Sequence, residues 1–184
     1  MVSLSNIQVL PKWVRNAVIG RRPKWTIIRV AVLVALVGLL RLFVFVQVRV
    51  EGISMEPTFH NNSINLIYML AYKFAKPQRG DVVGVRYAGS KVLLLKRVVA
   101  LPGETLAFIE GRLYIDGKLL LEPYVKYKCD WDMPPRTLGS NDYFVVGDNR
   151  SMPFMNHTKG AYQLEDIIGR ALFGGRGNPT LGTN

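Results

Sequence analysis

Cysteine and histidine are scarce in this sequence. Its 184 residues include one cysteine, Cys129, and two histidines, His60 and His157. One cysteine excludes an internal disulfide and any zinc site built from several thiolates, and two histidines leave little for a histidine metal cluster. The sequence also has no internal repeat, no GxGxxG motif and no P-loop. Its length leaves room for one modest domain with an appendage.

Acidic residues are absent from the first 50 positions. All 13 acidic residues lie at or after Glu51, whereas eight of the 24 basic residues precede it. Residues 51–184 therefore carry 16 basic and 13 acidic side chains, and the net charge of +11 belongs mainly to the N-terminal segment. A nucleic-acid-binding protein carries its basic patch on the folded body. The charge distribution thus disfavours a nucleic-acid partner.

A long apolar run lies within this basic N-terminal segment. Residues 30–40 are all apolar or glycine, and the only charges among the 22 residues 25–46 are Arg29 and Arg41. A helix of this length would reach roughly 33 Å, enough to cross a bilayer core. Arginines near the helix ends can extend to the headgroups, and Trp25 stands at the depth where tryptophan is enriched.

Three other interpretations of residues 25–46 are weaker. A cleaved signal peptide needs a small-x-small site after the apolar run, and the sequence there is FVFVQVRVEG. A helix packed on the core of a small domain and a helix lying on the membrane surface both keep a polar face towards water, which this run lacks. We therefore expect a single-pass anchor in the cell membrane. The six basic residues in 1–29 predict a cytoplasmic N-terminus over 1–24 and an extracytoplasmic body over 47–184.

The pattern after the anchor is that of β-strands. Valines alternate with other side chains over 44–50, as in a strand that leaves the membrane. Turn signals separate the further strand candidates, which are 63–70, 81–88, 91–101, 105–110, 112–120, 142–147 and 167–174. Asp116-Gly117 is typical of a type I′ hairpin turn, and the polar, proline-bearing residues 122–141 predict a long surface excursion. We expect a mainly β fold, with an antiparallel barrel-like body after one transmembrane helix.

Ser54 lies on a constrained turn after a predicted strand, in the segment VEGISMEPTF. Gly52 permits a positive φ or a close backbone approach, and Pro57 fixes its own φ and biases Glu56 towards extended geometry. Such a turn can expose a hydroxyl for nucleophilic chemistry. Taken alone, the segment is better explained by Ser54 and Thr58 forming hydrogen bonds within a turn.

Lys96 lies in the apolar strand LLLKRVV. Alternation places Lys96 and Arg97 on opposite faces, so one of the two cations must face an apolar environment or a cleft. Burial lowers a lysine pKa by up to about 3–5 units, and a lysine that is neutral near pH 7 can take a proton from a serine hydroxyl. A lysine that extends to solvent from an edge strand, or that forms an ion pair, explains the spacing at least as well.

Four segments resemble, in the same order, the motifs of bacterial type I signal peptidases. GISMEPTF (52–59) is similar to the nucleophile motif, RGDVVGVRY (79–87) to the next box and LKRVVALPGE (95–104) to the general-base box. VVGDNR (145–150) followed by GAYQLEDIIGRA (160–171) is similar to the last box and the strand after it. The resemblance implies a β body of the signal-peptidase type and a Ser-Lys protease that needs no metal ion and no organic cofactor.

The resemblance also implies roles for individual residues. Ser54 would be the nucleophile and Lys96 the general base, and the main-chain N–H of Ser54 would donate to the oxyanion. Some relatives add a hydroxyl two residues before the nucleophile; Gly52 stands there, so water or backbone would supply the second donor. Shallow pockets for small side chains would be lined by Val50, Met55, Phe59, Leu94 and Leu95. The residues that would support the site are Gly52, Pro57, Asp148, Asn149, Arg150 and Ser151.

The last box departs from the family pattern GDNR-x-x-S-x-D-S-R, whose serine contacts the catalytic lysine. Here the chain reads GDNRSMPFMNH, which puts Pro153 at the serine, Met155 at the aspartate and His157 at the arginine. Ser151 could contact Lys96 instead, from a shifted position.

The implied function is that of a membrane-bound serine endopeptidase that removes N-terminal signal peptides from exported preproteins after Ala-x-Ala-like ends. Its partners would be preprotein signal peptides and the lipid bilayer, and we expect a monomer. Cys129 is a second departure from the family pattern. Some relatives carry a disulfide in their long insertion, and the single cysteine of this chain cannot form an internal one. A specialised family member that matures pilins or secretion-system substrates remains open, and so does a non-catalytic membrane-tethered scaffold, which Pro153 permits. A repressor-type autoprotease is disfavoured by the apolar run and the missing helix-turn-helix.

Overall fold

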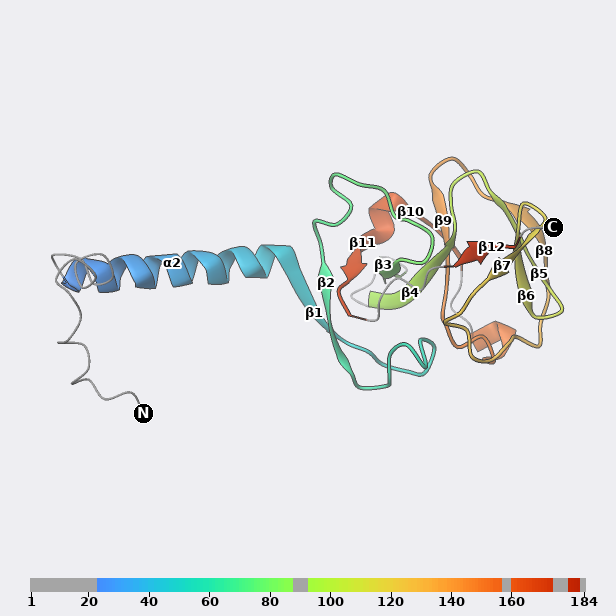
Figure 1. Ribbon diagram of the computed structural model, residues 1–184, viewed down its shortest axis with the longest axis horizontal. Helices are drawn as coiled ribbons and strands as arrows, with labels where there is room; N and C mark the ends of the chain where they lie inside the picture. The colour runs from blue at the N-terminus through green and yellow to red at the C-terminus, as the bar shows by residue number, and fades with distance from the viewer. Residues whose placement is uncertain (1–22, 88–92, 157–159, 174–178, 183–184) are drawn as a thin grey trace. The chain divides into compact units, whose positions relative to one another are not determined.

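The apolar N-terminal run forms a single helix in the computed structural model, α2 (Pro23–Val44), which begins and ends two residues earlier than the sequence predicted (Figure 1). The structure describes residues 23–87, 93–156, 160–173 and 179–182. The span Lys24–Val44 is long and apolar enough to cross a bilayer, and its most apolar stretch is not buried within the protein. An apolar surface of this length is consistent with a single membrane anchor.

The chain divides into two compact units, Met1–Phe43 and Val44–Asn184. The second unit, here called the body, begins where the alternating valines begin. Its first strand, β1 (Phe45–Arg49), pairs antiparallel with β2 (Ile64–Tyr68) along its whole length. The Met69 N–H, just after β2, donates to the Val44 carbonyl at 2.9 Å, so the hydrogen bonds between these two segments begin at Val44, the first residue of the body.

The described strands of the body form two antiparallel sheets. One has seven strands in the order β1-β2-β11-β3-β4-β9-β10, and the other has five in the order β12-β7-β6-β5-β8. The remaining elements are β3 (Val82–Arg86), β4 (Leu93–Ala100), β5 (Thr105–Ile109), β6 (Arg112–Ile115), β7 (Lys118–Leu121), β8 (Met133–Thr137), β9 (Asp142–Val146), η2 (Phe154–Asn156), β10 (Gly160–Gln163), η3 (Leu164–Asp166), β11 (Ile167–Ala171) and β12 (Thr180–Leu181). The prediction of a mainly antiparallel β fold with one N-terminal helix is therefore confirmed.

Among the described residues, three clusters of buried apolar side chains hold the sheets together. The largest lies over the five-stranded sheet and contains Phe108 and Trp131, whose ring centroids are 4.7 Å apart. A second packs on β3, β4, β9 and β11. The third consists of Val50, Met55, Phe59 and Val82. Val82 belongs to β3, and Met55 directly follows Ser54, so the third cluster packs the segment that contains Ser54 against β3. Burial of such side chains contributes about 1.5–3 kcal/mol each.

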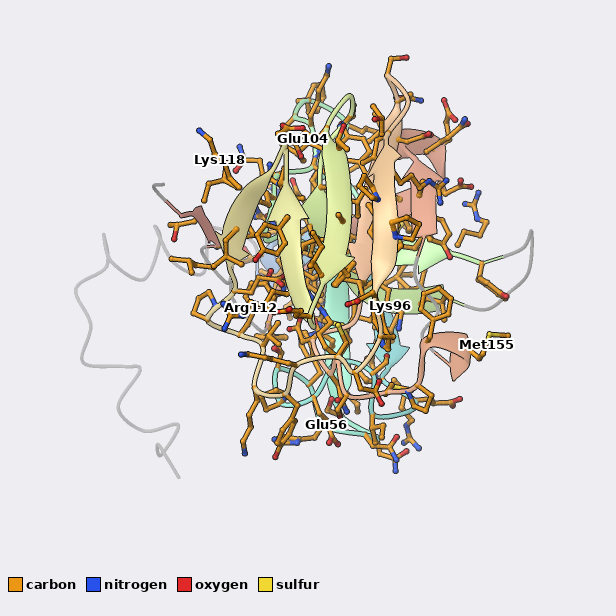
Figure 2. All side chains as sticks on the ribbon, turned by 90° about the vertical axis from the view of Figure 1, so that its right-hand side faces the viewer. Glu56, Lys96, Glu104, Arg112, Lys118 and Met155 are labelled. Atoms are coloured by element: carbon orange, nitrogen blue, oxygen red, sulfur yellow. The ribbon has the colours of Figure 1, made fainter. Side chains whose placement is uncertain are left out.

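The hairpin predicted at Asp116-Gly117 is confirmed. Asp116 and Gly117 have φ of +50° and +78°, and they join β6 to β7, the two strands of the hairpin predicted within 112–120. Positive φ at both central residues is what a type I′ turn requires. Figure 2 shows Lys118, which follows this turn, at the margin of the body, and Lys96 within it.

The segment 122–141 lies only partly on the surface, contrary to the predicted excursion. It contains β8, which pairs with β5 at the edge of the five-stranded sheet. The same segment contributes Cys129, Trp131 and Leu138 to the largest buried cluster. The strand was missed because it includes Pro134 and Pro135, and proline is tolerated in a sheet mainly where a strand lies at an edge. The short strands β10 and β12, also at sheet edges, were missed as well.

Candidate active site

The segment after β1 turns sharply and carries Ser54. Gly52 has a φ of +89°, which residues with a Cβ rarely adopt, and its N–H donates to Asn61 Oδ1 at 3.0 Å. The Glu56 N–H donates to the Ile53 carbonyl at 3.1 Å and closes the turn around Ser54. The positive φ explains why a glycine precedes this turn.

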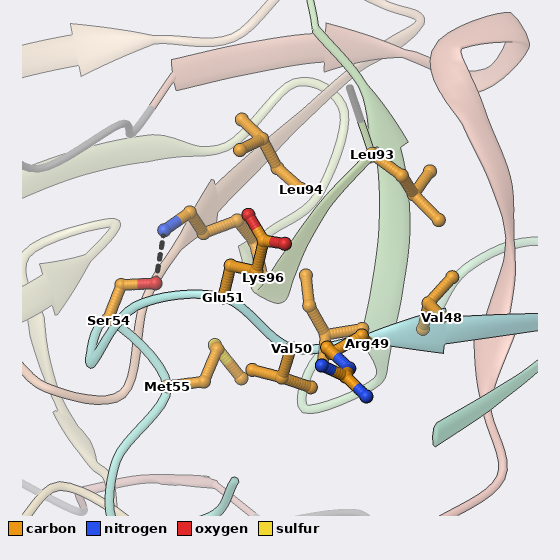
Figure 3. Close-up of a pocket in the computed structure, with 10 residues that line it drawn as sticks. Val48, Arg49, Val50, Glu51, Ser54, Met55, Leu93, Leu94 and Lys96 are labelled. Carbon is orange, nitrogen blue, oxygen red and sulfur yellow. Dashed lines mark hydrogen bonds between the residues drawn. The ribbon is translucent and has the colours of Figure 1, made fainter. Parts of the chain in front are cut away.

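Lys96 approaches Ser54 from β4. Its side chain is 3% exposed, and its Nζ donates a hydrogen bond of 2.9 Å to Ser54 Oγ (Figure 3). Burial lowers the pKa of Lys96 from 10.5 to about 8, against the opposing attraction of Asp148. The structure thus brings together the two residues that the sequence singled out. The alternative interpretation, in which Lys96 extends to solvent from an edge strand, is excluded by the burial of this side chain.

The neighbouring cation, Arg97, is also buried, although sequence alternation required this of only one of the two. Arg97 Nη2 lies 2.6 Å from Asp148 Oδ2, and its Nε donates to Oδ1 at 2.8 Å. Its Nη1 donates to the Gly80 carbonyl at 2.7 Å, and its guanidinium lies 3.9 Å from the ring centroid of Tyr124. The Thr58 hydroxyl also donates to Asp148. This network joins β4 to the segment of the nucleophile.

Residues 147–150 brace the backbone of Ser54. The Asn149 N–H donates to the Ser54 carbonyl at 3.1 Å, and the Asn149 side-chain Nδ2 donates to the Ile53 carbonyl at 3.2 Å. A Cβ on Gly147 would lie 2.2 Å from the Ser54 carbonyl oxygen, so only glycine fits there. Arg150 Nη2 lies 2.6 Å from Glu122 Oε1, and its Nε donates to the Gly147 carbonyl at 2.8 Å. The structure therefore places Asp148 and Asn149 in contact with the segment of Ser54, and Arg150 on the Gly147 carbonyl beside them.

Ser151 does not contact Lys96, so the prediction of a shifted lysine partner is wrong. Its hydroxyl donates to Asn149 Oδ1 at 2.7 Å. This local side-chain partner, two residues away, holds the hydroxyl. Among the residues that the structure describes, Ser54 is the only hydrogen-bond partner of Lys96 Nζ.

The other described positions of the divergent last box do not form hydrogen bonds to Lys96. Pro153 is exposed, and Met155 is 88% exposed at the periphery of the body (Figure 2). His157 lies outside the described residues. Pro57, which follows a cis peptide bond, is exposed on the far end of the Ser54 turn.

A cleft of about 480 Å³ opens beside the Ser54–Lys96 pair (Figure 3). It is lined by Val48, Arg49, Val50, Glu51, Ser54, Met55, Leu93, Leu94, Leu95 and Lys96. Four of the five predicted substrate-binding residues are among them. The fifth, Phe59, is buried against Val50 and Met55 and does not line the cleft.

Sequence reasoning missed several residues of the site. Val48, Arg49, Glu51 and Leu93 line the cleft because they extend the two strand segments already identified by their motifs, so adjacency alone could have found them. Thr58 was noted only as a turn residue. Tyr124 lies in the segment predicted to be a surface excursion, and no sequence signal pointed to its contact with Arg97.

Cys129 is buried and free, and its Sγ donates to the Trp131 carbonyl at 3.4 Å. Burial raises the pKa of this thiol, so it packs as a small apolar side chain. Within the part of the chain that the structure describes, no group of three or more histidine, cysteine, aspartate or glutamate side chains is placed to hold a metal ion.

Comparison with known proteins gives consistent matches. The family model described as "Signal peptidase, peptidase S26" matches residues 24–174. The chain is 36% identical over 157 residues to signal peptidase I S of Bacillus subtilis, covering 78% of this chain and 84% of the relative. It is 33% identical over 140 residues to signal peptidase I V of the same organism, covering 68% and 83%. A solved signal peptidase I from Enterococcus faecalis is 26% identical, covers 52% of this chain and 97% of its own, and gives a TM-score of 0.44.

Proposed function

We propose that Ser54 is the nucleophile and Lys96 the general base of this chain, which belongs to the signal peptidase family, peptidase S26. Membership makes the chain a serine peptidase that removes signal peptides, and its substrates are preproteins. The observation that carries the proposed roles is the 2.9 Å contact between Lys96 Nζ and Ser54 Oγ beside a cleft. The same contact argues against a non-catalytic scaffold.

The reaction begins from a neutral Lys96 amine, which its lowered pKa makes accessible near physiological pH. The amine accepts the Ser54 Oγ proton as Oγ forms a bond to the scissile carbonyl carbon. The resulting ammonium gives that proton to the leaving nitrogen as the C–N bond breaks, which releases the mature protein. Lys96 then takes a proton from a water that attacks the acyl ester, and Ser54 leaves with a proton as the signal peptide is released.

The oxyanion needs hydrogen-bond donors near Ser54. Among the described residues the Ser54 N–H has no partner, so it is free to donate, whereas the Gly52 N–H is already bonded to Asn61 Oδ1 at 3.0 Å. We infer that Ser54 N–H is one donor and that water supplies the second. Preorganised donors of this kind commonly contribute about 3–4 kcal/mol to transition-state stabilisation.

The cleft offers two strand edges to a peptide. Among the described strands, β1 ends the seven-stranded sheet, and the pairing of β4 with β9 begins only at Arg97, after residues 93–96. An extended peptide between these edges would gain main-chain hydrogen bonds. Because β1 and residues 93–96 both run towards the Ser54–Lys96 pair, a peptide parallel to them brings a carbonyl to Ser54 Oγ. The shallow apolar floor, formed by Val50, Met55 and Leu95, supports a preference for small side chains such as alanine.

The orientation in the membrane is inferred from charge. The six basic residues in 1–29 support a cytoplasmic N-terminus, and the body then lies outside. Ser54 follows Val44 by ten positions, which limits their distance to roughly 33–36 Å. The nucleophile therefore stays near the bilayer surface, where the cleavage site of a signal peptide emerges, and this shared location raises the effective concentration of the substrate. We propose that the chain acts as a monomer, since its dyad and cleft both lie within one body.

Cleavage of a preprotein by the full chain in detergent tests the proposed roles. Ser54→Ala and Lys96→Ala are each expected to lower the rate at least about 1,000-fold, because each removes a group that acts on the reacting atoms. Ser140→Ala and Lys73→Ala change exposed residues of the same types and serve as controls. Substantial turnover by either dyad variant, with a thermal unfolding curve like that of the wild type, would refute the assignment.

A further inference from the structure

The rim of the cleft carries two opposite charges that the proposed mechanism does not use. Arg49 and Glu51 both line the cleft, and both are exposed. Neither has an ion-pair partner among the described residues, and they do not pair with each other. The buried guanidinium of Arg97, by contrast, is paired with Asp148. Arg49 and Glu51 are therefore available to charged groups of a substrate.

The backbone separates these charges from the apolar floor of the cleft. Val50 is 6% exposed, whereas Arg49 and Glu51 on either side of it are exposed. This alternation is that of an extended segment, whose successive side chains point to opposite faces. The ladder with β2 reaches Arg49, and the Val50 N–H donates to the Ser63 carbonyl at 2.8 Å, so the segment stays extended to this point.

The two charges lie at different distances along the cleft from the reacting atoms. Figure 3 shows Glu51 nearer to Ser54 and Lys96, and Arg49 farther along the strand beside Val48. Residues two apart on an extended strand are separated by about 6.6 Å, which is also the spacing of alternate residues in a bound extended peptide. A peptide that lies along this segment can therefore meet both charges at once.

We propose that Glu51 and Arg49 form two charge-selective subsites, which bind a cationic side chain at position −2 and an anionic side chain at position −4 of the substrate. Position −1 is the residue whose carbonyl Ser54 attacks, and the inference rests on the proposed function. In a peptide parallel to β1, positions −1 and −3 place their side chains on the apolar floor, so positions −2 and −4 face the rim. Position −2 is nearer to the attacked carbonyl and meets Glu51; position −4 meets Arg49.

The expected preferences are modest because both side chains are exposed. An exposed ion pair changes binding by about two- to five-fold, so each subsite should change kcat/KM by that factor, mostly through KM. The preference should weaken when the ionic strength is raised above about 0.1 M, because the Debye length there falls below about 10 Å. The salt dependence separates a charge effect from a preference for side-chain shape.

The experiment uses the full chain in a non-ionic detergent at low salt. Peptides with alanine at −1 and −3 carry lysine, glutamine or glutamate at −2, and a second set carries the same three residues at −4. Wild type is expected to cleave the −2 lysine peptide about two- to five-fold faster than the −2 glutamate peptide. Glu51→Gln should remove this preference and Glu51→Lys should reverse it, while Arg49→Gln and Arg49→Glu do the same at −4.

Glu110 and Arg112 provide the matched control. They carry the same two charges, two residues apart and exposed, at the turn between β5 and β6, and they do not line the cleft. Glu110→Lys and Arg112→Glu change the net charge by the same amounts and should leave the preferences at −2 and −4 unchanged.

Two results would overturn the inference. One is equal cleavage of the lysine and glutamate peptides by wild type, and the other is a shift in preference in the Glu110→Lys control as large as in Glu51→Lys. The uncharged glutamine peptides distinguish a failure of the charge-selective subsites from a failure of the proposed function. If wild type cleaves them and Ser54→Ala does not, the dyad stands and only the charge-selective subsites are refuted; if wild type cleaves none of the peptides, the proposed function fails and this inference with it.

Discussion

Replacing Lys96 with methionine is expected to stabilise the body at neutral pH while it removes activity. The Lys96 side chain is 3% exposed, and its pKa falls from 10.5 to about 8 in the folded chain. This difference of about 2.5 pH units, at about 1.36 kcal/mol per unit, disfavours the buried ammonium by roughly 3 kcal/mol. Methionine fills a similar space without a charge. Loss of the hydrogen bond to Ser54 offsets about 1 kcal/mol, so the net stabilisation at pH 7 is about 2 kcal/mol.

The pH dependence of this stabilisation follows from the lowered pKa of Lys96. Below pH 8 the lysine is protonated in both the folded and the unfolded chain, so the full penalty applies. Between pH 8 and 10.5 the unfolded chain holds the proton and the folded chain does not, so wild-type stability rises with pH. Above this window the amine is neutral in both states and the penalty is gone. The methionine variant lacks the rise.

Urea unfolding of the full chain in detergent, followed by tryptophan fluorescence, measures the free energy of unfolding at pH 7 and pH 10. The difference between the methionine variant and wild type should shrink by about 2 kcal/mol from pH 7 to pH 10. Lys73→Met removes an exposed lysine and controls for the loss of one positive charge. The reasoning is refuted if Lys96→Met is less stable than wild type at pH 7, or if the difference is the same at both pH values.

Two further substitutions test the contacts that hold the dyad. Asp148→Asn leaves the buried Arg97 guanidinium without its carboxylate, so the free energy of unfolding should fall by about 3–5 kcal/mol in the same urea titration; a loss below about 1 kcal/mol would contradict the buried pair. Gly147→Ala puts a Cβ 2.2 Å from the Ser54 carbonyl oxygen. The resulting displacement of Ser54 should lower kcat/KM for preprotein cleavage about 100-fold. Gly160→Ala, whose Cβ would have an ordinary contact of 3.7 Å, should not, and equal losses in the two variants would contradict the account.

The parts of the fold and site that the sequence predicted are those written in local patterns. The helix followed from an uninterrupted apolar run, and the hairpin at Asp116-Gly117 followed from a dipeptide that tolerates positive φ at both positions. Gly52 predicted the turn before Ser54 because glycine tolerates a positive φ, and its φ is +89°. The apolar residues of β4 indicated that at least one of Lys96 and Arg97 is buried, but not which one.

The parts that could not be predicted depend on contacts between distant positions. Asp148 lies 51 positions from Arg97 in the sequence, and the residues around them do not indicate that the two form an ion pair. The strand β8 was hidden because its prolines are acceptable only at a sheet edge, and edges are a property of the whole sheet. The shift proposed for Ser151 failed because a bond to Asn149 was available locally.

The pH dependence of kcat/KM tests most directly the central claim, that Lys96 is the base that activates Ser54. Cleavage of the glutamine peptide by wild type, measured from about pH 6 to about pH 10 in detergent, should rise about tenfold per pH unit at low pH. It should level off above an apparent pKa of about 8, the value that burial gives Lys96. A flat profile, or one that levels off near pH 6.5, about the ordinary pKa of histidine, would contradict the account.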